Sequence, residues 1–291
     1  MPELPEIETI KSVIEPQIQG LTIENVLINR PEVIAHPTAD EFCKGVTGQA
    51  ISAMARRGKF LIINLDNQSK IILHLRMTGC LLVTPSDYQP EKHTHIIMQL
   101  SNRMELRFSD TRRFGRFWLI RNDEKDTYSG IEKLGLEPLS AECNAEYLQS
   151  CLGKRKKTMK ECLLDQSMIA GLGNIYSDEI LYRARINPST PANRLSVSEW
   201  ERLAFEITNC LHYFIDKNSI SQEDYLITKG QAYRNTPFLQ VYGRAGEICP
   251  NCGGTLCHTV IGGRSSVYCP NCQKSNLLHN KYNHKYKGRS Q

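Results

Sequence analysis

The spacing of apolar residues predicts a helix at the start of the chain. Five of them recur at intervals of three and four, which places them on one helical face: Ile7, Ile10, Val13, Ile14 and Ile18. The helix is expected from about Pro5 to Gln17, because proline suits a first helical turn and Gly20 suits the position just past the end.

Residues 22–120 have the pattern of strands. Four segments are short, rich in β-branched or aromatic residues and bounded by turn signals: Phe60–Leu65, Lys70–Leu75, Thr94–Leu100 and Glu105–Ser109. Asp66–Ser69 and Ser101–Arg103 resemble hairpin connections. Sequential strands with little helix between them predict an antiparallel sandwich or barrel.

The periodicity becomes helical after residue 144. Helices are expected at Ala145–Leu152, Met159–Leu164, Asn174–Ala184 and Ser196–Asp216. We predict an α+β protein with an N-terminal helix plus antiparallel β-sandwich domain (1–131), a linker (132–144), a helical domain (145–238) and a short hairpin with paired cysteines (239–273). The basic tail 274–291 is expected to be poorly ordered.

Composition and charge narrow the class of protein. The chain has 291 residues, of which 40% are hydrophobic, and no segment resembles a membrane span or a signal peptide, so a cytoplasmic protein is expected. Residues 1–153 hold 17 Lys and Arg against 20 Asp and Glu, a net charge of −3, whereas residues 154–291 hold 19 against 11, a net charge of +8. The basic half suits nucleic acid, although charge alone leaves an ordinary basic domain equally open.

Two CxxC motifs predict a metal site. Cys249 and Cys252 are separated by 16 residues from Cys269 and Cys272, which is the spacing of a four-cysteine zinc ribbon. Four thiolates leave no open position, so the zinc is expected to be structural. The alternatives are two disulfides, free thiols, or a ligand exchange with Cys257 or His258. The other six cysteines are expected to be buried: Cys43, Cys80, Cys143, Cys151, Cys162 and Cys210.

The N-terminus offers amine chemistry. Removal of Met1 would leave Pro2 with a free secondary amine, which can attack the anomeric carbon of a sugar and form an iminium. Glu3 beside it could move protons. Taken alone, a Met-Pro-Glu start is more often only the leader of a helix.

Several motifs together resemble bacterial formamidopyrimidine-DNA glycosylases, a family that includes endonuclease VIII. The resemblance covers roughly residues 2–273. It rests on these segments and on the paired cysteines: Pro2–Glu6, Arg56–Lys59, His74–Gly79, Asp110–Gly115, Gly171–Tyr176, Val241–Arg244 and Gly262–Arg264. Leu4 favours the formamidopyrimidine branch.

The resemblance implies a bifunctional enzyme that excises an oxidised base and then cuts the abasic strand. Pro2 would be the nucleophile, Glu3 the general acid/base, Lys59 an aid to β-elimination and Arg264 an aid to δ-elimination. Met77, Arg112 and Phe114 would fill the space left by the everted base. DNA contacts are implied for these residues: His74, His93, Arg112, Lys156, Lys160, Asn174 and Tyr242. Lys160 is expected nearer the damaged nucleotide, and Asn174 at the start of a helix in a helix–two-turn–helix motif.

The expected partner is double-stranded DNA with an oxidised base or an abasic site, bound by a monomer at the bacterial nucleoid, with one structural zinc and no catalytic metal. Arg76 and Thr111 depart from the commoner family residues. Residues 219–238, where the loop over the everted base is expected, match the family only loosely. Oxidised purines are therefore the predicted substrates, and oxidised pyrimidines are the alternative. A DNA-binding protein without chemistry remains possible if Met1 is retained.

Overall fold

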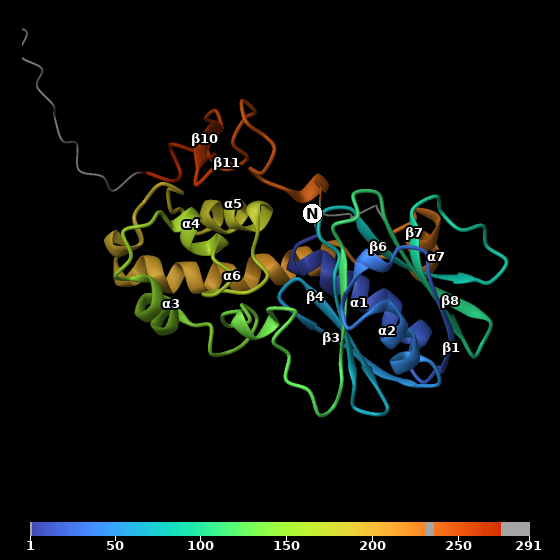
Figure 1. The fold of residues 1–291 in the computed structure, drawn as a ribbon. Coiled ribbons are helices and arrows are strands. Elements are labelled where there is room, and N and C mark those ends of the chain that lie inside the picture. Colours follow the sequence, from blue (N-terminus) through green and yellow to red (C-terminus); the bar gives the residue numbers. More distant parts are fainter. Residues whose placement is uncertain (1, 231–235, 275–291) are drawn as a thin grey trace, which may run out of the picture.

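The protein consists of two halves that lie side by side, with a small hairpin over the second (Figure 1). The computed structural model describes residues 2–230 and 236–274. The first half contains α1 (Leu4–Ile18), β1 (Ile23–Ile28), β2 (Ile34–His36), α2 (Ala39–Val46), β3 (Ile51–Arg57), β4 (Phe60–Leu65), β5 (Lys70–His74), β6 (Gly79–Pro85), β7 (Thr94–Leu100), β8 (Met104–Asp110) and β9 (Arg116–Ile120). The remainder contains α3 (Ala145–Leu152), α4 (Met159–Leu164), α5 (Asn174–Arg183), α6 (Val197–Lys217), α7 (Gln222–Ile227), β10 (Cys257–Ile261) and β11 (Arg264–Tyr268).

The predicted α+β sandwich is confirmed. One sheet has the strand order β1-β7-β8-β6 and the other has the order β2-β9-β5-β4-β3. All neighbouring strands in the two sheets are antiparallel except β2 and β9, which are parallel. Helix α2 lies in a region where only strands were predicted. Thr38 and Glu41 form a capping box at its start, a signal that the sequence already contains.

Helix α1 connects the cores of the two halves. Its apolar face from Ile7 to Ile18 is fully buried among the strands of the sandwich, as the periodicity predicts. Leu4, at the other end of the helix, is buried in the core of the helical half beside Tyr176 and Phe214. The first turn of α1 therefore lies where the two halves meet.

The helical half is built around α6, whose 21 residues bury one face that includes Trp200, Ile207 and Phe214. The chain then returns to the sandwich at α7, where Tyr225 is buried in the sandwich core and its hydroxyl donates to the carbonyl of Leu81 at 3.1 Å. The predicted helical domain 145–238 thus includes a segment that packs on the other half. Within the described part of the chain, no helix is long and apolar enough to cross a membrane.

Turns from both sheets gather at one rim of the sandwich. The strands β1, β3, β5 and β8 end there, and β4, β6, β7 and β9 begin there, because the pairing matches Phe60 with His74, Gly79 with Asp110, and Ile28 with Ile96. We call this edge the β3–β4 rim. The turns that join β4 to β5 and β7 to β8 lie at the opposite rim.

The sandwich core supplies a stability prediction. Phe108 is buried between the sheets and packs edge to face on Phe117, with 4.9 Å between the ring centres. Phe114, in contrast, is 49% exposed. Phe108→Ala should lower the free energy of unfolding by about 3–5 kcal/mol through the cavity it leaves. Phe114→Ala should change it by less than about 1 kcal/mol. Urea unfolding can be followed by Trp118 fluorescence in a Trp200→Phe background, and equal effects of the two variants would contradict this packing.

Candidate active site and DNA-binding surface

Six of the residues predicted for catalysis or DNA contact lie at the β3–β4 rim. Four are basic or polar and two are apolar: Lys59, His74, His93, Arg112, Met77 and Phe114. They come from four different turns, so only the sheet pairing brings them to one edge. The remaining predicted residues lie on α1, around α4 and α5, and on the hairpin side of the helical half.

Glu3 links α1 to the start of α5. It is 2% exposed, and its carboxylate accepts backbone N–H groups from Gly173 at 2.8 Å, Ile175 at 2.9 Å and Tyr176 at 3.3 Å. These donors belong to the first turn of α5, where the helix dipole also favours a negative charge. The contact fixes the Glu3 carboxylate against the helical half.

Lys59 reaches the same turn from the sandwich. Its ammonium group donates to the Leu172 carbonyl at 2.9 Å. A Cβ at Gly173 would lie 2.4 Å from the Glu3 carboxyl group and 2.8 Å from Lys59 Nζ, so only glycine allows both side chains to approach. Burial lowers the pKa of Lys59, and the positive charge of Arg264 lowers it further, while Glu3 opposes both effects.

Pro2 precedes Glu3 directly and is buried. It therefore belongs to the same enclosed region, at the boundary between the two halves. Met1, whose removal would free the Pro2 amine, lies outside the described residues.

Glu6 supports this end of α1 and was not singled out from the sequence. Its carboxylate accepts the Glu3 backbone N–H at 2.8 Å, the Asn218 amide at 3.3 Å and the Tyr176 hydroxyl. Burial raises the pKa of Glu6 to about 7, and the nearby charge of Glu3 adds to this effect. The carboxyl group of Glu6 thus joins the start of α1 to α5 and to the end of α6, next to the Pro2–Glu3 peptide.

His74 is held as a neutral donor. Its Nδ1 atom accepts the Arg76 backbone N–H at 3.0 Å, so in the neutral ring the proton is on Nε2. Burial, with the charges of Arg76 and Lys59, lowers the pKa of His74 to about 3. Above that pH the ring can donate one hydrogen bond from Nε2 without carrying a charge.

Met77, Arg112 and Phe114 form an exposed group on two turns. Met77 is 43% exposed and Phe114 is 49% exposed, and the Arg112 guanidinium lies 4.8 Å from the Phe114 ring centre. Ordinary strand packing, the alternative for the two apolar residues, does not account for this exposure. An apolar wedge beside a cation is suited to enter a base stack.

Asp110 holds these two turns together. It is 1% exposed, and its carboxylate accepts the backbone N–H of Arg112 at 3.1 Å, that of Gly115 at 2.8 Å, and the Thr78 hydroxyl. A single buried carboxylate thereby fixes both the Met77 turn and the Phe114 turn.

Lys160 is held inside the protein by a buried ion pair. The side chain is 0% exposed, and its ammonium group donates to Asp178 at 2.7 Å and to the Asn174 carbonyl at 2.9 Å. Asp178 also accepts the Val267 N–H at 3.0 Å and the Ser266 hydroxyl from β11. Through these hydrogen bonds Lys160 joins α4, α5 and the hairpin, and its expected position near the damaged nucleotide stays a prediction.

The other predicted contacts surround the start of α5. Asn174 is its first residue, partly exposed, and its side-chain oxygen has no hydrogen-bond partner among the described atoms. Lys156 is exposed before α4, and Arg264 is exposed at the start of β11. Burial lowers the pKa of both Lys59 and Lys160, and the positive charge of Arg264 lowers both further.

Tyr242 is positioned by a second carboxylate that the sequence did not reveal. Glu179, on α5, is 0% exposed and accepts the backbone N–H groups of Gln240, Val241 and Tyr242 at 2.9–3.1 Å. Burial raises the pKa of Glu179, and the three backbone donors oppose that rise. No motif marks Glu179, because its partners are about 60 residues away in the chain.

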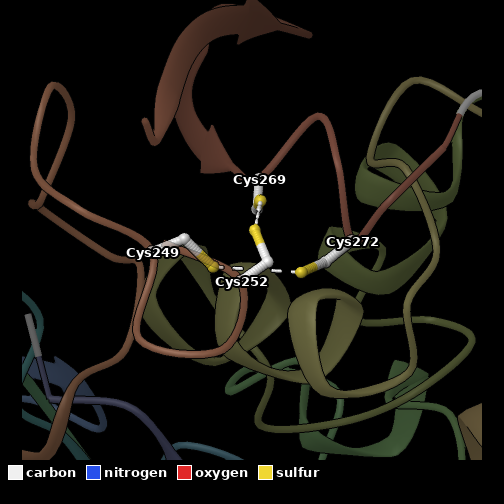
Figure 2. Close-up of side chains that lie close together, drawn as sticks. All are labelled: Cys249, Cys252, Cys269 and Cys272. Carbon is white, nitrogen blue, oxygen red and sulfur yellow. Dashed lines mark hydrogen bonds between the residues drawn. The ribbon is translucent and has the colours of Figure 1, made fainter. Parts of the chain in front are cut away.

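The four predicted zinc ligands converge (Figure 2). The Sγ atoms of Cys249, Cys252, Cys269 and Cys272 lie within 4.8 Å of one another, near the sulfur separation of about 3.8 Å that tetrahedral zinc with 2.3 Å bonds requires. The residues fit one structural zinc ion, and Cys257 and His258 are outside the cluster. Tyr182 from α5 lies 3.2 Å from Cys249 Sγ, so the site also contacts the helical half.

None of the eleven cysteines is in a disulfide. Four of the six scattered cysteines are buried, as predicted: Cys80, Cys143, Cys162 and Cys210. Cys43 and Cys151 are only partly buried, which corrects the expectation for those two.

Comparisons with known proteins follow the same division of the chain. Residues 1–117 match the formamidopyrimidine-DNA glycosylase N-terminal domain, residues 134–224 match the H2TH domain of that enzyme, and residues 246–274 match a zinc finger found in FPG and IleRS. The chain is 44% identical over 274 residues to the formamidopyrimidine-DNA glycosylase of Pelotomaculum thermopropionicum, with 94% of this chain and 99% of that protein covered. It is 38% identical to the Bacillus cereus enzyme, with 94% and 99% covered.

Solved structures agree. The Lactococcus lactis Fpg protein, in a complex with DNA that contains an oxidised pyrimidine, has a TM-score of 0.85 and 34% identity and covers 94% of this chain and 100% of its own. A MutM protein in complex with DNA containing carbocyclic 8-oxo-G has the same TM-score and 35% identity, with 94% and 100% covered. Sequence, fold and the four-cysteine cluster thus agree, and the chain belongs to the formamidopyrimidine-DNA glycosylase family.

Proposed function

We propose that this protein is a bifunctional DNA glycosylase and AP lyase of base excision repair. The observation that carries the proposal is the contact of Glu3 with the start of α5, beside the ammonium group of Lys59 and directly after the buried Pro2. One buried turn therefore brings together a candidate amine nucleophile, a carboxylate and a cation.

The chemistry uses these groups in sequence. The Pro2 nitrogen forms a bond to C1′ of the sugar and passes its proton to the Glu3 carboxylate. The damaged base leaves with the electron pair of its bond to C1′ and takes a proton from water. The sugar ring then opens as its ring oxygen takes a proton, which Glu3 is placed to deliver, and an iminium remains. The iminium acidifies the proton at C2′, so its removal expels the 3′ phosphate, and a second elimination expels the 5′ phosphate. Lys59 assists the first elimination and Arg264 the second.

DNA binding uses the groups around this turn. His74 donates from Nε2 to a phosphate, and Lys59, His93, Lys156, Asn174, Tyr242 and Arg264 grip the backbone near the lesion. Met77, Arg112 and Phe114 fill the gap in the stack when the damaged nucleotide leaves it. Lys160 acts indirectly, by holding α5 and β11 together through Asp178. The protein acts as a monomer in the cytoplasm, at the nucleoid.

Oxidised purines are the proposed substrates, namely 8-oxoguanine and formamidopyrimidines. The relatives' names support this choice. Oxidised pyrimidines are a second candidate, because the Lactococcus lactis protein is described with DNA that contains one.

Covalent trapping tests the reaction. With the N-terminus confirmed by mass as Pro2, borohydride should reduce the iminium and link the wild-type protein to abasic-site DNA. Pro2→Gly should trap at least about tenfold less, because a primary amine without the ring replaces the secondary amine. The matched control is the same protein with one extra residue before Pro2, which turns the amine into an amide and should abolish trapping. If the protein that begins at Pro2 does not trap, the chain is a DNA-binding protein without this chemistry.

Substrate choice can be measured on matched duplexes. Single-turnover excision of 8-oxoguanine paired with cytosine should be at least about tenfold faster than excision of thymine glycol, a difference of about 1.4 kcal/mol in the barrier. Both duplexes should have the same flanking sequence. Faster excision of thymine glycol would mean that oxidised pyrimidines, rather than oxidised purines, are the substrates. It would not contradict the lyase chemistry.

Glu6 predicts a pH effect on stability. Its pKa is about 7 in the folded protein against 4.5 ordinarily, so the folded state binds the proton more tightly. The stabilisation is fully present below pH 4.5 and is lost as the pH rises through 7, a change of about 3 kcal/mol. The difference in free energy of unfolding between wild type and Glu6→Gln should vary by that amount from pH 4.5 to 8. The exposed control Glu24→Gln should show no such variation, and a constant difference for Glu6→Gln would refute the assignment.

A further inference from the structure

A hollow at the β3–β4 rim is lined by His93 and otherwise by residues that have no role in the function proposed above. Its volume is about 290 Å3, and it lies between the end of β1, the segment before β7 and the turn after β8. The lining residues are Asn29, Arg30, Pro90, Glu91, Lys92, His93, Thr94, His95 and Arg113.

The hollow has an excess of positive charge. Arg30, Lys92 and Arg113 are exposed, and none of the three forms an ion pair with another described residue. Glu91 is the single acid in the lining, and its carboxylate already binds Lys229 at 2.8 Å. Three cations on one small surface repel one another, so an anion bound between them would relieve that repulsion.

Hydrogen bonds to the sheet hold two sides of the hollow. Asn29 donates from its side chain to the Thr94 carbonyl at 3.1 Å and from its backbone to the His95 carbonyl at 2.8 Å. The His95 ring bonds to the Asp110 carbonyl at 2.7 Å, and the Arg113 N–H donates to the same carbonyl. Arg30 and Arg113 therefore project from backbone that the sheet holds in place.

The location indicates which anion approaches. Arg113 lies between Arg112 and Phe114 in the turn from β8 to β9, which carries part of the proposed wedge. His93 also lines the hollow. Duplex DNA carries one negative charge for about every 1.7 Å of its axis, so a duplex opened by Phe114 must carry several phosphates past this surface.

We propose that Arg30, Lys92 and Arg113 form a phosphate-binding pocket that grips the DNA backbone beyond the wedge and extends the footprint along the duplex. This assignment rests on the proposed function, because it needs the wedge to enter DNA. The pocket contributes affinity and register but no base recognition, since phosphate contacts are the same for every sequence.

Salt dependence tests the pocket. The double variant Arg30→Gln/Lys92→Gln removes two cations and leaves Arg113, whose backbone φ of 58° makes substitution there less clean. The control Lys44→Gln/Lys70→Gln removes two exposed cations, one on α2 and one at the opposite rim, and neither residue has a positive φ. Dissociation constants are measured from 50 to 200 mM KCl, on a long duplex and on one shortened to a few base pairs on each side of an abasic-site analogue.

On the long duplex, the wild type and the control should lose roughly tenfold more affinity over this range than the pocket variant, because each phosphate contact contributes about 0.9 to the slope of log K against log salt. On the short duplex, which ends before the pocket, all three proteins should have the same slope. An unchanged slope for the pocket variant on long DNA would overturn the proposal. Trapping by the wild type is scored separately, so its failure would count against the enzyme function and not against the pocket.

Discussion

The active site depends on the contact between the Glu3 carboxylate and the first turn of α5. A carboxylate that is 2% exposed is costly to bury unless its oxygens are satisfied, and here three backbone N–H groups satisfy them. The contact joins residues 170 positions apart and brings the end of α1 against the helical half. Lys59 arrives from the sandwich at the same turn, where Gly173 leaves the necessary space. The proposed catalysis by Pro2 therefore requires both halves to be assembled.

Helix α5 organises the rest of the binding surface through two consecutive buried acids. Asp178 binds Lys160 and the β11 segment that follows Arg264, while Glu179 binds the backbone around Tyr242. The hairpin is too small to bury a core of its own, so the four-cysteine cluster and these carboxylates hold it in place. A zinc ion bound by the four cysteines would hold in place the hairpin that carries Arg264, a proposed phosphate contact.

Local patterns in the sequence predicted most of the elements. The strands at 60–65 and 94–100 and the helices at 145–152 and 159–164 match their predicted bounds, because each is an amphipathic or β-rich run closed by turn signals. Helix α2 was missed, because a short helix among strands has little periodicity and only its capping box marks it. The parallel pairing of β2 with β9 depends on a contact across about 80 residues, which no local pattern encodes.

The candidate site was predictable where chemistry determines the residue type, and less so where packing does. The paired cysteines and the Pro2–Glu3 start carry their chemistry in the sequence itself. Asp110 and Glu6 lie within motifs on which the family resemblance rests. That their carboxylates fix the neighbouring turns and helices becomes visible only from their hydrogen bonds. Lys160 is an example of a residue whose burial the sequence conceals. A lysine next to a basic run is expected to face solvent, but the structure pairs it with the buried Asp178.

The net charge of each half indicates that the partner is a nucleic acid, but it does not indicate which surface binds it. The first half has a net charge of −3, but its β3–β4 rim carries Lys59 and Arg112. Acids elsewhere in that half set the sum, and several of them are engaged with partners, as Glu91 is with Lys229. DNA responds to the potential of the surface that it touches, which depends on the cations left uncompensated there. Arg30, Lys92 and Arg113 meet that condition, and so an acidic half of the chain can still present a phosphate-binding edge.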